Sequence, residues 1–590
     1  MNSRTLLALP LAVAALAAGC GGSDDKESSG SSTTKSGTAS GAPTQGKQGG
    51  KLTVLYAADV DNIDPSITYY QYGFNVAYAT QRPLYSYKPD DQTNPEPDLA
   101  EGPPEISDDA KTVTIKIKKG VKFSPPVNRE VTSKDVKYAI ERGFTSSVPN
   151  GYNGAYMGDL IGAKTSAKPG TEIPGIETPD DQTVVFKLSK PTGAILAGAL
   201  VLPGSAPVPR DYALKYDKKN PSAYGVHQVS TGPYMVENDA SGKLVGYKAG
   251  RSIHLVRNPN WDKATDYKPA YLDEIQIDEG NTDPVVASRR ILQTDSMVNG
   301  DFQVPPSVLK QLSQGAQKAQ LNVSPPTGRI RYVSFDTTQK PFDDVNVRKA
   351  LNAAINRDAM RLAFGGKLVG DIPTHFIPPG LAGYEEAGGE KGPGVDFMAN
   401  PAGDLKLAQE YMKKAGYASG KYDGKETYLM VADSTGVQKK AAQVALQGIE
   451  QLGFKVNFQA VVRDSMYTKF CQVPSSKVAI CPSVGWLKDF ADPQTMLDPT
   501  FNGKNILKVG NSNFPEFDDE ETNAAMEKAK LVVGAKERAQ AWADVDKLLT
   551  EKAAAVPWLW DKQPNVLAKN VNGVINTANA SWDLTHTSLK

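Results

Sequence analysis

Three Ser-x-x-Lys spacings are the closest that the chain comes to a nucleophile beside a base. They begin at Ser23, Ser32 and Ser307. A serine of this motif acts together with Ser-Asp-Asn and Lys-Thr-Gly segments, and the sequence contains neither. The Gly-x-Ser-x-Gly, His-Glu-x-x-His, Gly-x-x-x-x-Gly-Lys-Ser/Thr and Gly-x-Gly-x-x-Gly signatures are also absent. We therefore expect that the protein is not an enzyme, and a secreted serine hydrolase is the disfavoured alternative.

Acidic pairs and metal-ligating side chains offer little more chemistry. The adjacent carboxylates at 343–344, 385–386 and 518–519 stand in polar or turn-like surroundings, which are typical of helix caps and solvated loops. The chain has only four His and three Cys, which leaves few ligands for zinc or iron. The sequence therefore predicts no metal site and no cofactor.

Composition excludes several classes of protein. At 590 residues the chain is roughly four times the length of a common domain of about 150 residues, so it should hold several domains or one large two-lobed unit. Lys plus Arg and Asp plus Glu both number 66, so no basic excess exists to bind a nucleic acid. A hydrophobic share of 40% with 24 Tyr, 17 Phe and 6 Trp excludes a wholly disordered chain, and 52 Gly and 41 Pro exclude a long coiled coil.

The first twenty residues indicate export. Arg4 precedes an apolar run at 6–18 that is too short to span a bilayer of about 30 Å, which is typical of a secretory signal peptide. The run ends in Leu-Ala-Ala-Gly before Cys20, which resembles a bacterial lipobox whose cysteine becomes the lipidated N-terminus. The alternative is an ordinary signal peptide with an incidental cysteine. We expect an extracytoplasmic protein anchored to the membrane through Cys20.

A polar segment separates this signal from the rest of the chain. Residues 21–50 are rich in Ser, Thr, Gly, Lys and Gln and contain almost nothing apolar. Such a segment cannot recover the entropy lost on ordering, so we predict a flexible tether.

Two cysteines remain once Cys20 is set aside. Cys471 and Cys481 form an even pair, and in an oxidising compartment such a pair predicts a disulfide that closes a small loop. Two buried thiols are the alternative. A metal site is a weaker alternative, because no His lies between His375 and His586.

Strand and helix patterns mix along the body of the chain. Apolar residues alternate over 112–118, which predicts a half-buried strand. Thr132 followed by Asp135 has the spacing of a capping box and predicts the start of a helix. Further strands are expected at 51–56, 331–335 and 455–462, and further helices after Asp344, after Asn356 and over 442–452.

Short blocks of sequence then give a specific resemblance. Their order and spacing are similar to those of the peptide/nickel-type extracellular solute-binding proteins of ABC importers, over residues 51 to about 560. The blocks include Pro-Asp-Leu-Ala-Glu at 97–101, Ile-Ser-Asp-Asp at 106–109, Gly-Val-Lys-Phe-Ser at 120–124, Ser-Thr-Gly-Pro-Tyr at 230–234, Pro-Phe-Asp-Asp-Val-Asn-Val-Arg-Lys-Ala at 341–350 and Gly-Trp-Leu-Lys-Asp-Phe-Ala-Asp-Pro at 485–493. The match is loose over 289–302, and the loop between the two cysteines is not general to the family.

The resemblance implies an α/β, two-lobed fold of the periplasmic-binding-protein type, with an extra subdomain inserted in lobe one. Lobe one is expected at 51–330 and 557–590, and lobe two at 331–556. The two crossings between the lobes are expected at 329–336 and 556–561, where the sequence predicts extended chain.

The resemblance also implies a function without covalent chemistry. A solute-binding protein closes its lobes around a ligand, and a membrane permease recognises the closed form. The expected partners are an ABC permease with its ATPase subunits, a peptide or other small solute, and the membrane through the lipid, but no nucleic acid. We expect a monomer.

Six residues are predicted to contact the ligand. In peptide-binding relatives that the 485–493 block resembles, the acid at the position of Asp489 pairs with the α-amino group of the peptide. The alternative is that Asp489 caps a turn or pairs with Lys488. Trp486 should line a side-chain pocket, although core packing is nearly as plausible, and Gly485 can offer backbone groups to an extended ligand. The remaining candidates are Tyr69, Tyr70 and Tyr72.

The identity of the ligand stays open at this stage. Asp489 favours a peptide, whereas the same fold could bind an oligosaccharide, an opine or a metal chelate. No Arg, Lys or His that would bind a ligand carboxylate is implied by a motif, so the sequence does not indicate peptide length.

Overall fold

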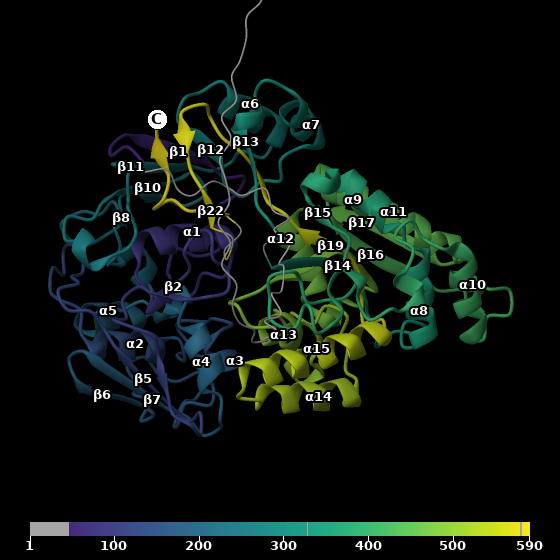
Figure 1. The fold of residues 1–590 in the computed structure, drawn as a ribbon, viewed down its shortest axis with the longest axis horizontal. Helices are drawn as coiled ribbons and strands as arrows, with labels where there is room; N and C mark the ends of the chain where they lie inside the picture. Colours follow the sequence, from purple (N-terminus) through teal and green to yellow (C-terminus); the bar gives the residue numbers. More distant parts are fainter. Residues whose placement is uncertain (1–45, 327, 577, 579–580) are drawn as a thin grey trace, which may run out of the picture. The chain divides into compact units, whose positions relative to one another are not determined.

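The computed structural model describes residues 46–326, 328–576, 578 and 581–590 (Figure 1). Cys20, the predicted signal peptide and residues 21–45 of the predicted tether lie outside the described residues. The end of the predicted tether differs from the prediction. Lys47 bridges to Leu589, and the Gly49 N–H donates to the Tyr271 carbonyl at 2.8 Å. Backbone pairing with distant segments therefore gives these residues a defined conformation, which contacts of their polar side chains alone would not provide.

The first large sheet has six strands in the order β12-β1-β11-β10-β8, with β9 paired to β10. Strand β1 is parallel to both β11 and β12, whereas β10 is antiparallel to β11. The helix α1 (Gln71–Thr80) packs beside β8. The strands are β1 (Lys51–Leu55), β8 (Tyr234–Val236), β9 (Tyr247–Lys248), β10 (Ser252–Arg257), β11 (Glu274–Asp278) and β12 (Met297–Asn299).

A second, antiparallel sheet belongs to the segment between α1 and β8. Its strands run in the order β4-β5-β7-β6, and they have a hydrophobic core of their own. Helix α2 begins with the predicted capping box, in which the Thr132 and Asp135 side chains each bond to the backbone of the other residue. The elements are β4 (Glu105–Ile106), β5 (Thr112–Lys116), α2 (Ser133–Arg142), α3 (Asn153–Met157), β6 (Ile176–Asp180), β7 (Thr183–Lys187), α4 (Gly193–Ala199) and α5 (Arg210–Asp217).

The third sheet also has six strands, in the order β15-β19-β14-β18-β16-β17. The strands β14 and β18 are antiparallel neighbours, and β16 is parallel to β17. Asp344 and Asn356 cap the helices α8 and α9, as the sequence predicted. The strands are β14 (Arg329–Phe335), β15 (Gly370–Asp371), β16 (Thr427–Asp433), β17 (Lys455–Val461), β18 (Ile480–Leu487) and β19 (Val556–Asp561).

Helices accompany the third sheet on the same stretch of chain, and Figure 1 draws them in green to yellow. Helix α11 contacts α9, β16, β17 and β18, and α14 packs on α15. The helices are α8 (Val345–Ala354), α9 (Arg357–Phe364), α10 (Leu405–Lys414), α11 (Gly436–Gln451), α12 (Arg463–Ser465), α13 (Gln494–Phe501), α14 (Glu520–Lys530) and α15 (Ala535–Glu551), with a π-helical turn at Met466–Cys471.

The chain passes between the first and third sheets twice. It leaves β13 (Leu321–Val323) to enter β14, and it leaves β19 to enter β20 (Pro564–Val566), which pairs with β13. We call the described residues before β14 and after β19 lobe one, and β14 to β19 lobe two. The predicted α/β fold with two lobes and an added subdomain is thereby confirmed. Strand β19 stays in the lobe two sheet through Asp561, beyond the predicted end at 556.

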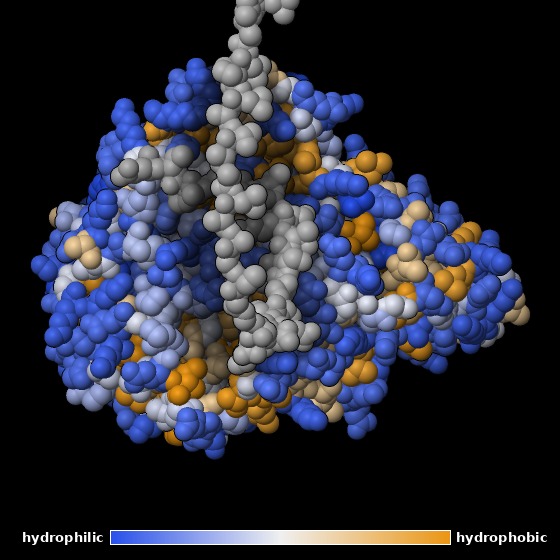
Figure 2. All heavy atoms as spheres, in the orientation of Figure 1, coloured by the Kyte–Doolittle hydropathy of each residue, from blue (hydrophilic) through white to orange (hydrophobic). Residues whose placement is uncertain are grey.

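Apolar side chains fill the space between sheets and helices, and polar ones cover the outside. Figure 2 shows hydrophilic residues over most of the visible face, with hydrophobic residues in small groups. Scattered apolar residues of this kind are normal on a folded surface. None of the helices in the described ranges is both long and apolar enough to cross a bilayer.

Candidate functional site

Asp489, two residues past the end of β18, meets the hydroxyl groups of two lobe one tyrosines. Tyr69 Oη donates to Asp489 Oδ1 at 3.1 Å, and Tyr156 Oη donates to Asp489 Oδ2. Tyr69 precedes α1 and Tyr156 lies on α3, so one carboxylate of lobe two collects donors from two separate elements of lobe one. No Lys, Arg or His among the described residues forms an ion pair with it.

The surroundings of Asp489 disfavour its charge. Burial raises the pKa of its carboxyl to about 7, although the hydrogen bonds from Tyr156 and Tyr69 oppose that rise. The carboxyl is therefore close to half ionised at neutral pH. A cation placed beside it would favour the ionised form and would itself gain a charged partner. The arrangement thus suits a group such as a ligand ammonium.

Lys488 does not provide that cation. Its side chain is almost fully buried, and Nζ donates to Gln92 Oε1 of lobe one at 3.1 Å. Burial lowers the pKa of Lys488 to about 7. The alternative in which Asp489 pairs with its neighbour therefore does not apply to this structure.

The ring of Tyr69 lies among other aromatic rings. It stacks on Tyr152 with centroids 4.8 Å apart, and it lies 6.0 Å from the ring of Trp486. Trp486 itself is 8% exposed, and its Nε1 donates to the Thr495 carbonyl at 2.8 Å. Trp486 thus packs mainly in the lobe two core and presents one side to Tyr69, so a pocket-lining role stays a prediction.

Gly485 has a structural reason to be glycine. It pairs with Arg331 across the β14–β18 ladder, and a Cβ built on it would lie 2.5 Å from the Ile330 carbonyl oxygen. The close approach of β14 leaves no space for a side chain. On its other edge β18 pairs with β16 only at Ile480, so addition of an extended ligand beside Gly485 stays a prediction.

The other two predicted tyrosines lie at the start of α1. The Tyr70 and Tyr72 rings are 5.6 Å apart, and Tyr70 is 37% exposed. Tyr72 Oη accepts a hydrogen bond of 3.2 Å from Arg463 Nη2 on α12. The predicted tyrosines therefore share one segment of lobe one, and that segment contacts lobe two at both Asp489 and Arg463.

The segment after Asp489 is inserted into lobe one. Phe490 is 2% exposed and belongs to the core of the inserted subdomain, where its ring meets Tyr156 edge-on at 4.9 Å. The Ala491 N–H donates to Tyr87 Oη at 3.1 Å. These contacts join the lobes, so the structure describes a closed arrangement of the two.

The predicted cysteine pair is joined in the structure. Cys471 ends the π-helical turn, and Cys481 lies near the start of β18, with an S–S distance of 2.01 Å. The bond therefore ties the segment that carries Arg463 to the strand that leads to Asp489.

Sequence reasoning named Asp489, Tyr69 and Tyr72 but missed residues that lie against them. Tyr156 and Arg463 stand in no motif that marks a ligand site, and Phe490 lies within the 485–493 block but was not named as a candidate. Tyr156 is 333 residues away from Asp489 in sequence, so only the fold brings the two together.

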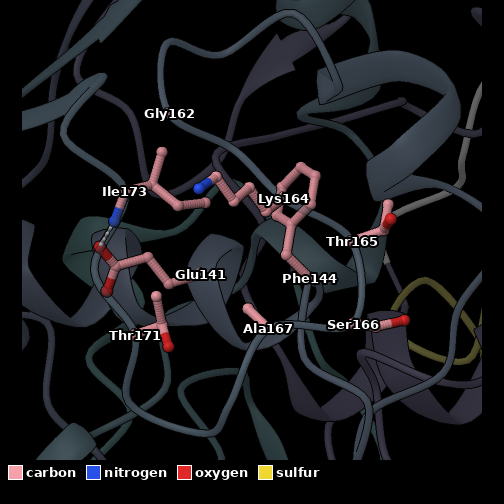
Figure 3. Close-up of a pocket in the computed structure, with 9 residues that line it drawn as sticks. All are labelled: Glu141, Phe144, Gly162, Lys164, Thr165, Ser166, Ala167, Thr171 and Ile173. Carbon is pink, nitrogen blue, oxygen red and sulfur yellow. Dashed lines mark hydrogen bonds between the residues drawn. The ribbon is translucent and has the colours of Figure 1, made fainter.

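A cavity of about 230 Å³ lies elsewhere, within the inserted subdomain (Figure 3). Glu141 accepts the Ile173 N–H at 2.8 Å there, and burial raises the pKa of Glu141 to about 7. The cavity is smaller than typical ligand pockets of about 300–1,000 Å³ and has no lining residue from lobe two. It is lined by Glu141, Phe144, Gly162, Lys164, Thr165, Ser166, Ala167, Thr171 and Ile173.

No group of three or more His, Cys, Asp or Glu side chains is placed to hold a metal ion in the described part of the chain. What the described residues bring together is a carboxylate, tyrosine hydroxyls and an arginine at the contact between two lobes. Groups of these types can bind and orient a polar ligand.

Comparison with known proteins decides the family. Residues 94–508 match the model of the bacterial extracellular solute-binding proteins, family 5. The chain belongs to this family. The resemblance seen in the sequence blocks is therefore confirmed.

Individual relatives are similar along most of their length. The chain is 25% identical to heme-binding protein A of Haemophilus influenzae over 488 residues, which cover 79% of this chain and 78% of the relative. It is 26% identical to the glutathione-binding protein GsiB of Salmonella choleraesuis over 478 residues, covering 80% and 82%. The solved structure of clavulanic acid biosynthesis oligopeptide binding protein 2 has a TM-score of 0.78 at 26% identity, covering 92% of this chain and 96% of that one.

Proposed function

We propose that this solute-binding protein captures a ligand with a free ammonium group, in the first place a peptide, between its two lobes. The carrying observation is Asp489, a carboxyl with two tyrosine donors and no cationic partner among the described residues. A ligand ammonium would supply the missing positive charge. Departure of the ligand would again leave the buried carboxylate without a charged partner. Glutathione-binding and oligopeptide-binding relatives support this choice of ligand.

Capture of the ligand is followed, in this proposal, by its delivery to a membrane permease. The contacts of Asp489, Phe490 and Ala491 with lobe one exist only when the lobes are closed together, so a ligand that adds contacts across them favours this state. An ABC permease with its ATPase subunits is the proposed recipient of the closed, loaded protein. The protein does no covalent chemistry in this scheme.

We also propose that Cys20 carries a lipid that holds the body outside the cytoplasmic membrane. One acyl chain binds a membrane only marginally, so firm anchoring needs more than one chain. Metabolic labelling with an acyl analogue should mark the wild type and not Cys20→Ala. Absence of label on the wild type would remove the anchor from the proposal.

Calorimetry with a tripeptide pair tests the ligand. Ala-Ala-Ala should bind, whereas its N-acetylated form and the Asp489→Asn variant should each lose about thirtyfold or more in affinity. The two losses should not add in full, because each removes one partner of the same ion pair. Asp108→Asn, an exposed carboxylate of lobe one, is the matched control.

Mass spectrometry of material that copurifies with the protein identifies the natural ligand. A ligand without an amine, bound equally by wild type and Asp489→Asn, would replace the peptide with another solute such as an oligosaccharide, an opine or a metal chelate.

A further inference from the structure

Lobe one contains a short hairpin that ends at the contact between the lobes. Its strands β2 (Tyr85–Ser86) and β3 (Glu96–Pro97) pair antiparallel, and residues 87–95 form the loop between them (Figure 1). Lys88 Nζ, at the start of the loop, lies 3.0 Å from Glu96 Oε1 and joins the two arms of the hairpin on its exposed side.

The loop of the β2–β3 hairpin is organised by its own side chains. Asp91 Oδ1 accepts the backbone N–H groups of Thr93 at 2.8 Å and Asn94 at 3.0 Å, and Asp91 Oδ2 accepts Asn94 Nδ2 at 2.9 Å. Although burial opposes the change, hydrogen bonds from Asn94 and Thr93 lower the pKa of Asp91 to about 2, so its carboxylate is ionised at neutral pH. These contacts all lie within lobe one, and they do not require the lobes to be closed.

Gln92, at the tip of this loop, reaches into lobe two. Its Oε1 accepts a hydrogen bond of 3.1 Å from Lys488 Nζ. A Cβ built on Gly380 would lie 2.1 Å from Gln92 Nε2, so the Gln92 amide packs against backbone that has no side chain. The Gln92 side chain therefore contacts two segments of lobe two that are about a hundred residues apart in sequence.

Lys488 depends on Gln92 for a hydrogen bond. The Lys488 residue is 4% exposed, and Gln92 Oε1 is the acceptor that its Nζ finds within the described ranges. A buried amine that loses its acceptor costs free energy, more so when it is charged. Burial of Lys488 and docking of Gln92 therefore favour one another.

Tyr87 contacts the same segment of lobe two on the other side of Asp489. Its ring is 6% exposed and belongs to the core of the inserted subdomain, and its Oη accepts the Ala491 N–H at 3.1 Å. Lys488 precedes Asp489 by one residue and Ala491 follows it by two. The β2–β3 hairpin thus holds the chain on both sides of Asp489.

We propose that the β2–β3 hairpin is a clasp that keeps the lobes closed, with Gln92 and Tyr87 as its two contact points on lobe two. Each of these contacts joins protein to protein, so the clasp stabilises the closed state whichever ligand is bound. The clasp then sets how long a ligand is held, whereas Asp489 sets which ligand is preferred. This inference goes beyond the proposed function and rests on it only for the choice of peptide probes.

Release of Ala-Ala-Ala after rapid dilution, followed by tryptophan fluorescence, tests the clasp. Gln92→Ala should release the tripeptide at least about tenfold faster than the wild type, because its closed state buries the Lys488 amine without an acceptor. Gln92→Glu keeps an acceptor and should release the tripeptide no faster than the wild type. Gln314→Ala and Gln314→Glu, at the exposed end of α7 (Pro306–Gln314) in lobe one, are the matched controls.

Tyr87→Phe tests the second contact point. It keeps the ring and removes the acceptor of the Ala491 N–H, so release should be about threefold faster. Tyr85→Phe is the control in the same hairpin, because Tyr85 Oη donates to the Gly102 carbonyl within lobe one at 3.1 Å. The clasp is overturned if Gln92→Ala and Tyr87→Phe release the tripeptide as their controls do, or if Gln92→Glu releases it as fast as Gln92→Ala.

N-acetylated Ala-Ala-Ala separates the clasp from the proposed function. Because the clasp does not touch the ligand amine, Gln92→Ala should speed release of both probes by the same factor. If N-acetylation and Asp489→Asn leave affinity unchanged while Gln92→Ala speeds both releases, the ammonium site fails and the clasp stands. If both changes lower affinity while the Gln92 and Tyr87 variants behave as their controls, the clasp fails and the proposed function stands.

The free protein decides the case in which neither peptide binds. The contacts of Gln92 and Tyr87 need no ligand, so small-angle scattering should give free Gln92→Ala a larger radius of gyration than the free wild type. Equal radii would overturn the clasp.

Discussion

The ring of Phe490 occupies the space that a side chain on Gly198 would need. A Cβ built on Gly198, at the end of α4, would lie 2.7 Å from the ring. Phe490 belongs to lobe two and Gly198 to the inserted subdomain of lobe one, so this fit exists only while the lobes are closed. The absence of a side chain at Gly198 is therefore a condition for closure.

Gly198→Val should hold the lobes apart. Because the clash arises only in the closed state, we expect affinity for Ala-Ala-Ala to fall by more than about tenfold, with little change in the Tm of the free protein. Small-angle scattering should show a larger radius of gyration for the variant than for the wild type at saturating ligand.

Gly204→Ala is the matched control, because a Cβ at Gly204 meets only the Ser66 Cα at 3.9 Å. Unchanged affinity in Gly198→Val would contradict the role of Phe490 in closure.

Affinity for an amine ligand should depend on pH through Asp489. The pKa of Asp489 is about 7 in the free protein, and a bound ammonium would lower it. Binding then requires loss of a proton below pH 7, so affinity should fall by up to about tenfold for each pH unit from 7 towards 5. Calorimetry in buffers of different ionisation enthalpy should detect proton release at pH 6.

Asp489→Asn should bind weakly with a nearly flat profile over the same range. An equally steep profile in Asp489→Asn would assign the dependence to another group, such as Lys488, whose pKa is also near 7.

Much of the fold was predictable because its signals are local. The capping box of Thr132 and Asp135 and the alternation over 112–118 each concern neighbours in sequence, and both elements form where expected. Asp489 could be named because it lies in a family block. Tyr156 and Arg463 could not, because a tyrosine on a short helix and an exposed arginine carry no pattern until the two lobes meet. The need for glycine at 198 is likewise created by Phe490, far away in sequence.

Glu279 should make stability fall at alkaline pH. Both of its carboxylate oxygens are buried, and burial, with the neighbouring carboxylates of Asp59 and Asp301, raises its pKa to about 8. The folded state thus holds a proton that the unfolded chain releases near pH 4.3, so this stabilisation is complete below that pH and is lost as pH rises through 8. The Tm of the wild type should fall between pH 6 and 9.

Glu279→Gln should show a smaller fall, because its amide carries no charge to bury. Glu105→Gln, an exposed position on β4, should behave as the wild type does. Identical pH profiles for Glu279→Gln and the wild type would remove Glu279 as the cause.

The cysteine pair should contribute both stability and the placement of Arg463. Cys471 and Cys481 are ten residues apart, and closing a loop of that size contributes about 2 to 3 kcal/mol in the chain-entropy treatment. The double variant Cys471→Ala/Cys481→Ala should lose up to that amount of unfolding free energy in denaturant unfolding.

Because the bond ties the π-helical turn after α12 to β18, the variant should also bind Ala-Ala-Ala more weakly while its response to N-acetylation is retained. Non-reducing peptide mapping of the wild type should recover the two cysteines in one linked peptide pair. Two free thiols there, or a double variant as stable as the wild type, would contradict this account.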